Sequence, residues 1–365
     1  MQKILTVIGT RPQYVKAAVL SRAFLELAPD EIHETVVDTG QHFDDNMSRL
    51  FLEKLGGLSP RLNLGISGGG HSSLTGRMLV ALEPVLERER PDAVLVYGDT
   101  DSTLAGALSA AQAGLPLIHV ESGLRSGDRT MPEEINRIVT DSLASINLCP
   151  TKNALANLVK AGLGDSATFV GDLMLDSFVR ARGTAPASLP KNGFERSQIL
   201  ITLHRPSNVD SDPQFLNILS GIQQLARHYN IVWPVHPRTR KKLEELKINP
   251  VDFGVDFREP MNHDALLSSL ADSQLVITDS GGLQKEAYFS GVGCLVLRKT
   301  SEWPELIASG AGRLVDIEVE NLFEATQSHL SKTFTPDYEM FGGGGVAEKA
   351  VSVIVNSLRN RLLIG

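Results

Sequence analysis

Acidic residues gather in one stretch of the chain, residues 94–137, at places where apolar runs break off beside glycines. Asp99 and Glu121 each follow an apolar run, and Glu133 stands with Glu134 directly after a proline. A carboxylate at the end of a buried strand is costly to desolvate unless it has a partner. Three such places in one short stretch predict a site whose chemistry depends on carboxylates, as general acids, bases or positioning groups.

A second group of residues is suited to holding an anion. An apolar run ends at Asp279, Ser280-Gly281-Gly282 follow, and a helix is predicted to begin there. Backbone N–H groups at a helix N-terminus, with glycines that allow close approach, make a phosphate site. Glu286 lies further along the helix, where its carboxylate could accept ribose hydroxyls. The alternative is a tight strand–helix turn capped by Ser280, and the sequence supports the two interpretations about equally.

Two histidines follow strand-like runs in the same part of the chain. His204 and Arg205 come directly after the run ILITL, and His236 precedes Arg238 in PVHPR. A single histidine is more often a hydrogen-bonded structural residue than a catalyst. Two of them at predicted strand ends, each near an arginine, favour contacts with a pyrophosphate.

Basic residues also follow the first predicted strand. Arg11 lies between Gly9 and Pro12, in the turn before a helix, where its guanidinium is placed to reach an anion. Lys16 is further along the same predicted helix and could equally be an ordinary solvated residue. Arg11 is therefore the stronger candidate for anion binding.

The elements that must position these residues alternate between strands and helices. Such alternation predicts parallel, doubly wound sheets, whose ligands bind beyond the carboxyl ends of the strands. The candidate residues fall at those ends. Strands are predicted at 3–8, 34–37, 93–97, 117–120, 146–149, 168–170, 199–203, 231–235, 255–258, 275–278, 294–297 and 313–316. Helices are predicted at 13–27, 45–55, 73–88, 102–113, from 132 onwards, and at 213–228, 238–246, 263–271, 283–289, 319–330 and 347–363.

Two domains are expected from the chain length and from a break in composition. The chain has 365 residues, more than a single core usually spans. A Pro-, Gly- and Ala-rich run places the hinge within residues 172–195. We predict an α/β protein with Rossmann-like domains at 1–175 and 176–345 and a last helix, 346–365, that could cross back to the first. Two such domains facing a cleft form the GT-B arrangement used for sugar nucleotides.

Composition and charge exclude several classes of function. The net charge is −8, from 35 Lys and Arg against 43 Asp and Glu, which argues against nucleic acid or an anionic membrane as a partner. Because no membrane-length apolar run or signal-peptide pattern occurs, a cytoplasmic protein is expected. Cys149 and Cys294 are expected to be buried free thiols. No HExxH pattern or Cys/His cluster occurs, so no metal site is predicted.

The candidate residues fall within segments that resemble one family, the non-hydrolysing UDP-N-acetylglucosamine 2-epimerases. Several segments are weakly specific alone, but together they cover nearly the whole chain in the family's order and spacing. The segments are GTRPQ (9–13), TGQH (39–42), YGDTDSTLA (97–105), HVESGLRSGD (119–128), PEEINR (132–137), HRPSN (204–208), PVHPR (234–238) and DSGGLQKE (279–286).

The resemblance implies inversion of a UDP-sugar at carbon 2 of the hexose, by elimination of UDP to a 2-acetamidoglucal and re-addition, without a nicotinamide cofactor. It implies that Asp99, Glu121 and Glu133 are acid/base and positioning carboxylates, without saying which is the base, and that His204 contacts the departing diphosphate. A homodimer is implied as well. Substrate or UDP binding is implied for Arg11, Lys16, Arg137, His236, Ser280, Gly281, Gly282 and Glu286.

The chain departs from the family's pattern at four places. Trp303 stands where many members have arginine, and Gln13 where glutamate is common. Both variants resemble the branch that acts on UDP-2,3-diacetamido-glucuronate-type sugars, although HRPSN lacks that branch's usual Ala-Glu pair. The loop 65–70 lacks the Arg-Gln element with which some bacterial members hold an activating UDP-GlcNAc. Phe341-Gly342 replaces the family's Asn-Pro-Tyr-Gly.

Several functions stay open at this point. UDP-GlcNAc is the first substrate to test, with the diacetamido uronate sugar, or hydrolysis to free ManNAc and UDP, as alternatives. A GT-B glycosyltransferase would share the nucleotide grip but does not need three carboxylates in its first domain. A UDP-sugar sensor without activity would bind the sugar nucleotide and tolerate Asp99→Asn.

Overall fold

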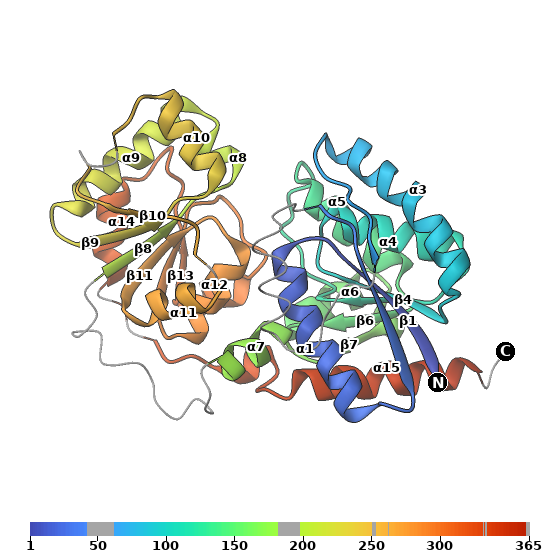
Figure 1. Ribbon diagram of the computed structural model, residues 1–365. Coiled ribbons are helices and arrows are strands. Elements are labelled where there is room, and N and C mark those ends of the chain that lie inside the picture. The colour runs from blue at the N-terminus through green and yellow to red at the C-terminus, as the bar shows by residue number, and fades with distance from the viewer. Residues whose placement is uncertain are drawn as a thin grey trace. The chain divides into compact units, whose positions relative to one another are not determined.

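The chain folds into two compact units, unit 1 (Met1–Arg180 with Asp337–Gly365) and unit 2 (Ala181–Pro336). Each contains one parallel sheet with helices on both faces (Figure 1). The expected α/β class with two Rossmann-like folds is confirmed. The structure, a computed structural model, describes residues 1–41, 62–181, 198–249, 253–261, 263–330, 332 and 334–362.

The sheet of unit 1 has the strand order β3-β2-β1-β4-β5-β6-β7, and all neighbours are parallel. Its strands are β1 (Gln2–Ile8), β2 (Ile32–Asp38), β3 (Leu62–Asn63), β4 (Ala93–Tyr97), β5 (Leu117–Val120), β6 (Ile146–Cys149) and β7 (Ala167–Phe169). Its helices are α1 (Arg11–Leu27), α3 (His71–Glu89), α4 (Asp101–Gln112), α5 (Pro132–Leu143), α6 (Lys152–Lys160), α7 (Leu173–Ala181) and α15 (Val346–Leu362), with short 3₁₀ turns η1 (Gly164–Ser166) and η4 (Tyr338–Phe341).

The sheet of unit 2 has the order β10-β9-β8-β11-β12-β13, again with parallel neighbours. Its strands are β8 (Gln198–Thr202), β9 (Asn230–Pro234), β10 (Asp256–Arg258), β11 (Ser273–Thr278), β12 (Gly293–Val296) and β13 (Gly312–Leu314). Its helices are α8 (Pro206–Val209), α9 (Asp212–Ala226), α10 (Pro237–Glu245), α11 (His263–Ala271), α12 (Gly281–Phe289), α13 (Pro304–Ala308) and α14 (Leu322–Leu330).

Strand β4 shows how one apolar run serves two cores. Ala93, Leu95 and Tyr97 are buried with residues of α1 and α15, whereas Val94 and Val96 are buried with residues of α3 and α4. Successive side chains of a strand point to opposite faces. A strand covered on both sides must therefore be apolar throughout, as its sequence indicated. Burying each such side chain contributes roughly 1.5–3 kcal/mol.

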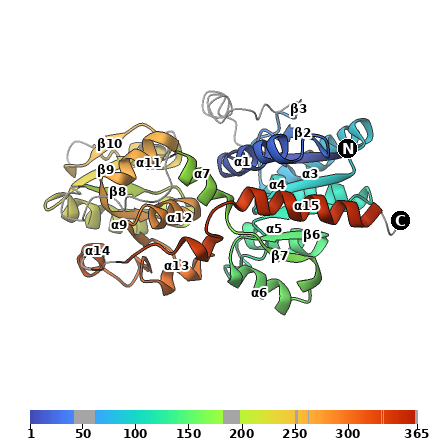
Figure 2. The same ribbon diagram turned by 90° about the horizontal axis from the view of Figure 1, so that it is seen from below.

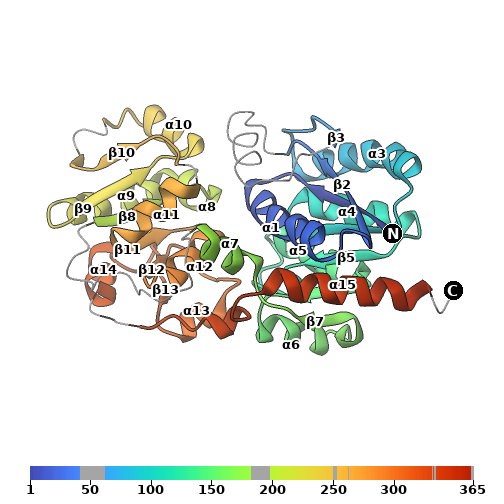
Figure 3. The ribbon, with the colours of Figure 1, turned by 60° about the horizontal axis from the view of Figure 1, so that its bottom comes forward.

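The last helix, α15, belongs to unit 1. It runs along α1 on the same face of the sheet (Figures 2 and 3). Val346, Ala350 and Ile354, spaced four apart on one face of the helix, are buried in the cluster that contains α1. The domain limits predicted from the sequence, 1–175 and 176–345, stay a prediction about which parts fold independently.

Several elements of the structure were not predicted. The helices α6, α7, α8 and α13 are absent from the predicted set, and α7 lies in the range that was predicted to contain the hinge. The two-residue strand β3 was not predicted either, because it is too short to show any periodicity. The predicted helix 45–55, and His42 before it, lie outside the described residues. Cys149 and Cys294 are buried free thiols, as expected. None of the helices in the described ranges has the length and apolar content that a membrane span needs.

Each sheet has one place where the strand order reverses, which we call its switch point. In unit 1 it lies between β1 and β4, and in unit 2 between β8 and β11. The connections that follow these two strands leave on opposite sides of the sheet, which opens a crevice at their carboxyl ends. The switch points therefore mark where ligands of each unit are expected, and the predicted site residues cluster there.

Two glycines form a close backbone crossing in unit 1. Gly171, just before α7, and Gly342, just after η4, have positive φ angles of 103° and 97°. A Cβ on Gly342 would lie 2.7 Å from the Gly171 Cα, and one on Gly171 would collide with the Phe341 carbonyl oxygen. That carbonyl accepts from the Asp172 N–H at 3.0 Å. Gly342 is therefore required by the space as well as by the backbone angle.

We predict that Gly171→Ala and Gly342→Ala each lower the free energy of unfolding by about 3 kcal/mol, because steric overlap adds to backbone strain. The matched control is Gly344→Ala. Gly344 also has a positive φ, 94°, but a Cβ there meets nothing within 4 Å. Strain alone should cost it roughly 1–2 kcal/mol. Urea unfolding measures all three, and equal losses would contradict the crossing as the cause.

Candidate active site

One side chain, Gln13, ties the turn after β1 to the turn after β4. Its Oε1 accepts from the backbone N–H groups of Gly9 and Thr10 at 2.8 and 3.0 Å. Its Nε2 donates to the Tyr97 carbonyl oxygen at 2.8 Å and lies 2.9 Å from the Thr103 hydroxyl. Gln13 is 2% exposed, and its amide groups are committed to the protein. It braces both sides of the unit 1 switch point.

Glu121 follows β5 directly and has a positive φ of 68°. For a residue with a Cβ this conformation costs roughly 1–2 kcal/mol, and such strain is concentrated at functional sites. The carboxylate pairs with Nζ of Lys16 on α1, and the two side chains are 10% and 7% exposed. Because a buried ion is destabilising without its counter-ion, Lys16 fixes where Glu121 lies.

Asp99 lies in the turn between β4 and α4, with its side chain 28% exposed. Its Oδ2 pairs with Nη2 of Arg137 on α5, and its carbonyl oxygen accepts from Nδ2 of Asn136 at 2.9 Å. The buried Arg137 also reaches Oε2 of Glu134 with Nη1, at 3.1 Å. In unit 1 this guanidinium thus holds two carboxylates, partners that the sequence did not predict for it.

The neighbours Glu133 and Glu134 differ in their surroundings. The buried Glu134 accepts from the N–H groups of Ser126 and Gly127, at 2.8 and 3.2 Å. Burial alone would raise the pKa of Glu134, but these hydrogen bonds and the Arg137 charge lower it below its usual value. Glu133 is half-buried, and no hydrogen bond or ion pair within the described chain occupies it. Glu134 therefore shapes the loop before α5, whereas Glu133 keeps its carboxylate available.

In unit 2 a buried carboxylate organises the turn after β8. Asp279, at the end of β11, accepts from the N–H groups of His204 and Arg205 at 3.1 and 2.9 Å and from Nδ2 of Asn208 at 3.1 Å. Its Oδ1 lies 2.9 Å from Nδ1 of His204. Burial would raise the pKa of Asp279, but the His204 hydrogen bond and charge, with the other donors, lower it. The ionised carboxylate receives the Nδ1 proton, so Nε2 is the nitrogen of His204 that remains for a ligand.

The second histidine, His236, lies beside His204, as their positions at strand ends predicted. The two ring centroids are 5.5 Å apart. His236 caps α10 by accepting from the Arg238 N–H at 3.2 Å with its Nδ1. The structure thus brings both histidines to one place in unit 2.

The turn Ser280–Gly282 begins α12 beside the unit 2 switch point. Ser280 is the N-cap and accepts from the Leu283 N–H at 3.4 Å. A Cβ on Gly281 would collide with Oε1 of Glu302, whereas one on Gly282 meets nothing within 4 Å. Both interpretations of this segment therefore apply: Ser280 caps the helix, and the backbone at Gly282 is open to a ligand.

The structure also places Glu286 and Arg11, two residues that were predicted to bind the substrate or UDP. Glu286 on α12 is buried, and its Oε1 lies 2.9 Å from Nε2 of His263, a partner that the sequence did not predict. Arg11 is the first residue of α1 and is half-buried at the carboxyl end of β1. Within the described ranges no group of three or more His, Cys, Asp and Glu side chains is placed to hold a metal.

Comparison with known proteins identifies the family. The profile of the UDP-N-acetylglucosamine 2-epimerase family matches residues 26–355. A UDP-2,3-diacetamido-2,3-dideoxy-D-glucuronate 2-epimerase of Pseudomonas aeruginosa is 43% identical, over 95% of this chain and 98% of its own. The chain belongs to the UDP-N-acetylglucosamine 2-epimerase family. A UDP-N-acetylglucosamine 2-epimerase of Methanocaldococcus jannaschii is 36% identical, over 96% of this chain and 98% of its own.

Solved structures of the epimerase family have the same fold. The crystal structure of the Methanocaldococcus jannaschii UDP-GlcNAc 2-epimerase in complex with UDP-GlcNAc and UDP has a TM-score of 0.86 at 34% identity, and the match covers 97% of this chain and 99% of that one. The Neisseria meningitidis UDP-GlcNAc 2-epimerase bound to UDP-GlcNAc has a TM-score of 0.85 at 29% identity, covering 97% and 100%.

The two departures from the epimerase pattern that suggested a uronate sugar are both buried. Gln13 braces backbone turns, so it is not itself evidence for a substrate. Trp303 is 2% exposed, and Nζ of the buried Lys285 lies 4.1 Å from its ring centroid, a cation–π contact inside unit 2. Its indole Nε1 would be 3.8 Å from a Cβ on Gly281. Trp303 thus packs against the Ser280–Gly282 turn at Gly281.

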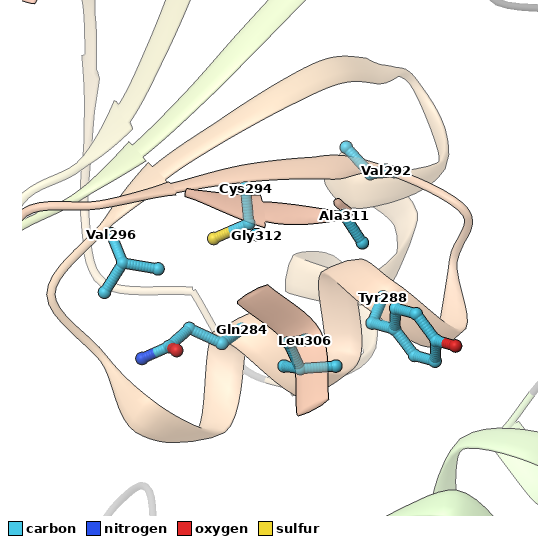
Figure 4. Close-up of a pocket in the computed structure, with 8 residues that line it drawn as sticks. All are labelled: Gln284, Tyr288, Val292, Cys294, Val296, Leu306, Ala311 and Gly312. Atoms are coloured by element: carbon cyan, nitrogen blue, oxygen red, sulfur yellow. The ribbon is translucent and has the colours of Figure 1, made fainter. Parts of the chain in front are cut away.

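A small hollow lies beside α12. It is lined mainly by apolar side chains, including Tyr288, Cys294 and Leu306 (Figure 4). It has no room for a water molecule, so it is a packing defect of the unit 2 core.

Sequence reasoning assigned no role to Asp279 and did not find the partners of Glu121 and Asp99. Asp279 meets the criterion that singled out Asp99, an acidic residue at the end of an apolar strand, and that signal could have found it. The pairing of Lys16 with Glu121 and of Arg137 with Asp99 had no such signal, because the partners are 105 and 38 residues apart.

We predict that Gly282→Ala weakens UDP binding about tenfold without changing the melting temperature, because its backbone is open to a diphosphate. Gly281→Ala should instead lower stability by about 2 kcal/mol, since Glu302 is held by Arg298 at 2.6 Å and cannot yield. Gly76→Ala is the control, a helical glycine of α3 whose Cβ meets nothing within 4 Å. Calorimetry with UDP measures the affinity, and an unchanged Kd for Gly282→Ala would contradict the anion site.

Proposed function

We propose that this chain inverts a UDP-linked 2-acetamido sugar at carbon 2 of the hexose. The observation that supports this most is the set of carboxylates in unit 1. Asp99 and Glu121 follow the neighbouring strands β4 and β5, and each is paired with a buried cation. Glu133 stands on α5, the helix whose Arg137 holds Asp99. Moving a proton off one face of a carbon and onto the other needs a base and an acid, and this unit offers three carboxylates for them.

The reaction we propose has two halves. A carboxylate takes the proton from carbon 2, the electron pair forms the double bond between carbons 1 and 2, and the bond from carbon 1 to the diphosphate oxygen breaks, which releases UDP. In the second half UDP returns to carbon 1 while a carboxylate protonates carbon 2 on the opposite face. Each half conserves atoms and electrons, so no redox cofactor is needed. The assignment of base and acid among Asp99, Glu121 and Glu133 stays open.

His204 is proposed to act on the departing diphosphate. The buried Asp279 fixes the ring by accepting from Nδ1, which leaves Nε2 as the nitrogen that can meet a phosphate oxygen. The Ser280–Gly282 turn, His236 and Glu286 are proposed to bind the UDP portion, and Arg11 to bind a phosphate. Lys16 and Arg137 are proposed to act through Glu121 and Asp99, whose positions they set.

Two sugars remain candidates. The features common to the family support UDP-GlcNAc, the ligand named for the Methanocaldococcus jannaschii and Neisseria meningitidis structures. The identity of 43% to the diacetamido-glucuronate epimerase, against 36% to the Methanocaldococcus jannaschii enzyme, favours the uronate sugar. We therefore propose UDP-2,3-diacetamido-glucuronate as the better substrate and UDP-GlcNAc as the second.

The other classes have less support. A glycosyltransferase, that of kitacinnamycin, matches with a TM-score of 0.55 at 14% identity, which reflects the shared fold alone. A hydrolysing epimerase would release free sugar and UDP as its main products. A homodimer and a cytoplasmic location are proposed from the family resemblance.

The decisive test is product analysis by NMR with each UDP-sugar, for the wild type and for Asp99→Asn, Glu121→Gln and Glu133→Gln. We expect the 2-epimer as the main product, and a kcat lowered about 1,000-fold in each variant because a positioned acid or base is lost. The affinity for UDP should stay within about threefold of the wild type, a change of less than about 1 kcal/mol in the free energy of binding.

The matched control is Glu87→Gln, an exposed carboxylate on α3, which should keep wild-type kcat. Free sugar as the main product would favour the hydrolysing type, and transfer to an acceptor would favour a glycosyltransferase. Near-normal rates in all three site variants would contradict the assignment of the carboxylates.

A further inference from the structure

A fully buried histidine, His119, connects the loops of unit 1 that carry Asp99 and Glu121. It lies on β5, two residues before Glu121, and is 0% exposed. Its Nε2 lies 2.8 Å from the carbonyl oxygen of Gly98, the residue before Asp99. Its Nδ1 lies 2.8 Å from Oδ1 of Asp141 on α5. The ring thus spans from the end of β4 to the helix that carries Glu133.

The chemistry of these partners fixes the protons of the ring. A carbonyl oxygen can only accept a hydrogen bond, so Nε2 must donate to Gly98. Asp141 is 0% exposed. It accepts hydrogen bonds from Nη1 of Arg125 at 2.6 Å and from the N–H of Gly123 at 3.2 Å, and an ionised carboxylate can accept from both donors. An ionised Asp141 accepts from Nδ1 as well. Both nitrogens of His119 then donate, which only the imidazolium form can do.

The other groups around the ring are consistent with this charge. Burial would raise the pKa of Asp141, but the hydrogen bond and charge of His119, and Arg125, lower it below its usual value. On the neighbouring strand β6, burial above all, with a contribution from the Asp141 charge, raises the pKa of Cys149 to about 12, so its thiol stays neutral. The Asn147 amide, also on β6, donates to the Asp141 carbonyl at 3.2 Å. Among the contacts of the described residues, the charged groups at the ring are Asp141 and, beyond it, Arg125.

We propose that His119 is held as an imidazolium whose hydrogen bond to the Gly98 carbonyl positions Asp99 relative to Glu121 and α5. The ring is a positioning residue, because it contacts backbone and Asp141. Gly98 has a positive φ of 64° and Glu121 one of 68°, so both connections need outside support to keep these conformations. The catalytic part of this inference rests on the proposed epimerase function, whereas the charge of the ring does not.

The protonation state is tested by NMR of ¹⁵N-labelled imidazoles at pH 8, well above the ordinary histidine pKa of about 6.5. We expect protons on both ring nitrogens of His119. The internal control is His329 of unit 2, which is also buried but has one ring nitrogen 3.1 Å from the Ala311 carbonyl oxygen and a pKa lowered by burial. It should carry one proton. A singly protonated His119 at pH 8 would overturn the proposal, whatever the activity of the protein.

Two variants separate the Gly98 hydrogen bond from the charge. His119→Asn keeps an amide nitrogen where Nδ1 was, so Asp141 retains a partner, but nothing reaches the Gly98 carbonyl. Asp141→Asn keeps both hydrogen bonds, since the introduced amide donates to Nδ1 and the ring becomes neutral. We expect kcat to fall about 100-fold in His119→Asn, because even a small displacement of a reacting group lowers the rate by about that factor. In Asp141→Asn kcat should stay within about threefold.

The readouts distinguish positioning from loss of structure. In His119→Asn the UDP affinity should be unchanged, and the kinetic isotope effect from deuterium at carbon 2 should rise, because proton abstraction becomes rate-limiting. His329→Asn is the control for replacing a buried histidine and should leave kcat unchanged. An unaltered kcat in His119→Asn, or an equal loss of kcat in His119→Asn and Asp141→Asn, would overturn the proposal. A wild type without epimerase activity would contradict the proposed function instead, with the NMR result unaffected.

Discussion

An ionised carboxylate at the end of a buried parallel strand must have a cation or a set of N–H donors beside it, because desolvation of an unpaired ion costs several kcal/mol. In unit 1 the cations come from the helices that cover the sheet. Lys16 on α1 meets Glu121, and Arg137 on α5 meets Asp99. The loops that carry the carboxylates can therefore take their final shape only when those helices have docked, which links the folding of the unit to the assembly of its site.

Unit 2 meets the same constraint with hydrogen-bond donors. Asp279 has no lysine or arginine side chain paired with its carboxylate among the described contacts. Instead, the turn after β8 wraps around it, and two backbone N–H groups and the Asn208 amide satisfy its oxygens. The consequence is a fixed His204 ring whose remaining nitrogen is free to meet a phosphate. One carboxylate thus shapes a turn and sets the orientation of a histidine.

Local sequence was enough to predict the architecture and to place the candidate residues at strand ends within it. Strands such as β4, apolar on both faces, and acidic residues directly after them are features of contiguous sequence. The partners of those acidic residues are not, because Lys16 and Glu121 meet only through the β1–β4–β5 order of the sheet. Gln13 is a second case. Its departure from the family pattern suggested a uronate sugar, whereas its role in joining two backbone turns is visible only in the packed structure.

The central claim is that carboxylates held in this way exchange the proton on carbon 2 of a UDP-sugar. The most direct test is to incubate the protein with UDP-2,3-diacetamido-glucuronate and with UDP-GlcNAc in deuterium oxide and to follow carbon 2 by NMR. The account predicts that a deuteron from solvent appears at carbon 2 of both epimers of at least one sugar, because the proton leaves from one face and returns to the other. Epimerisation with full retention of the original proton, or the absence of any exchange with both sugars, would contradict it.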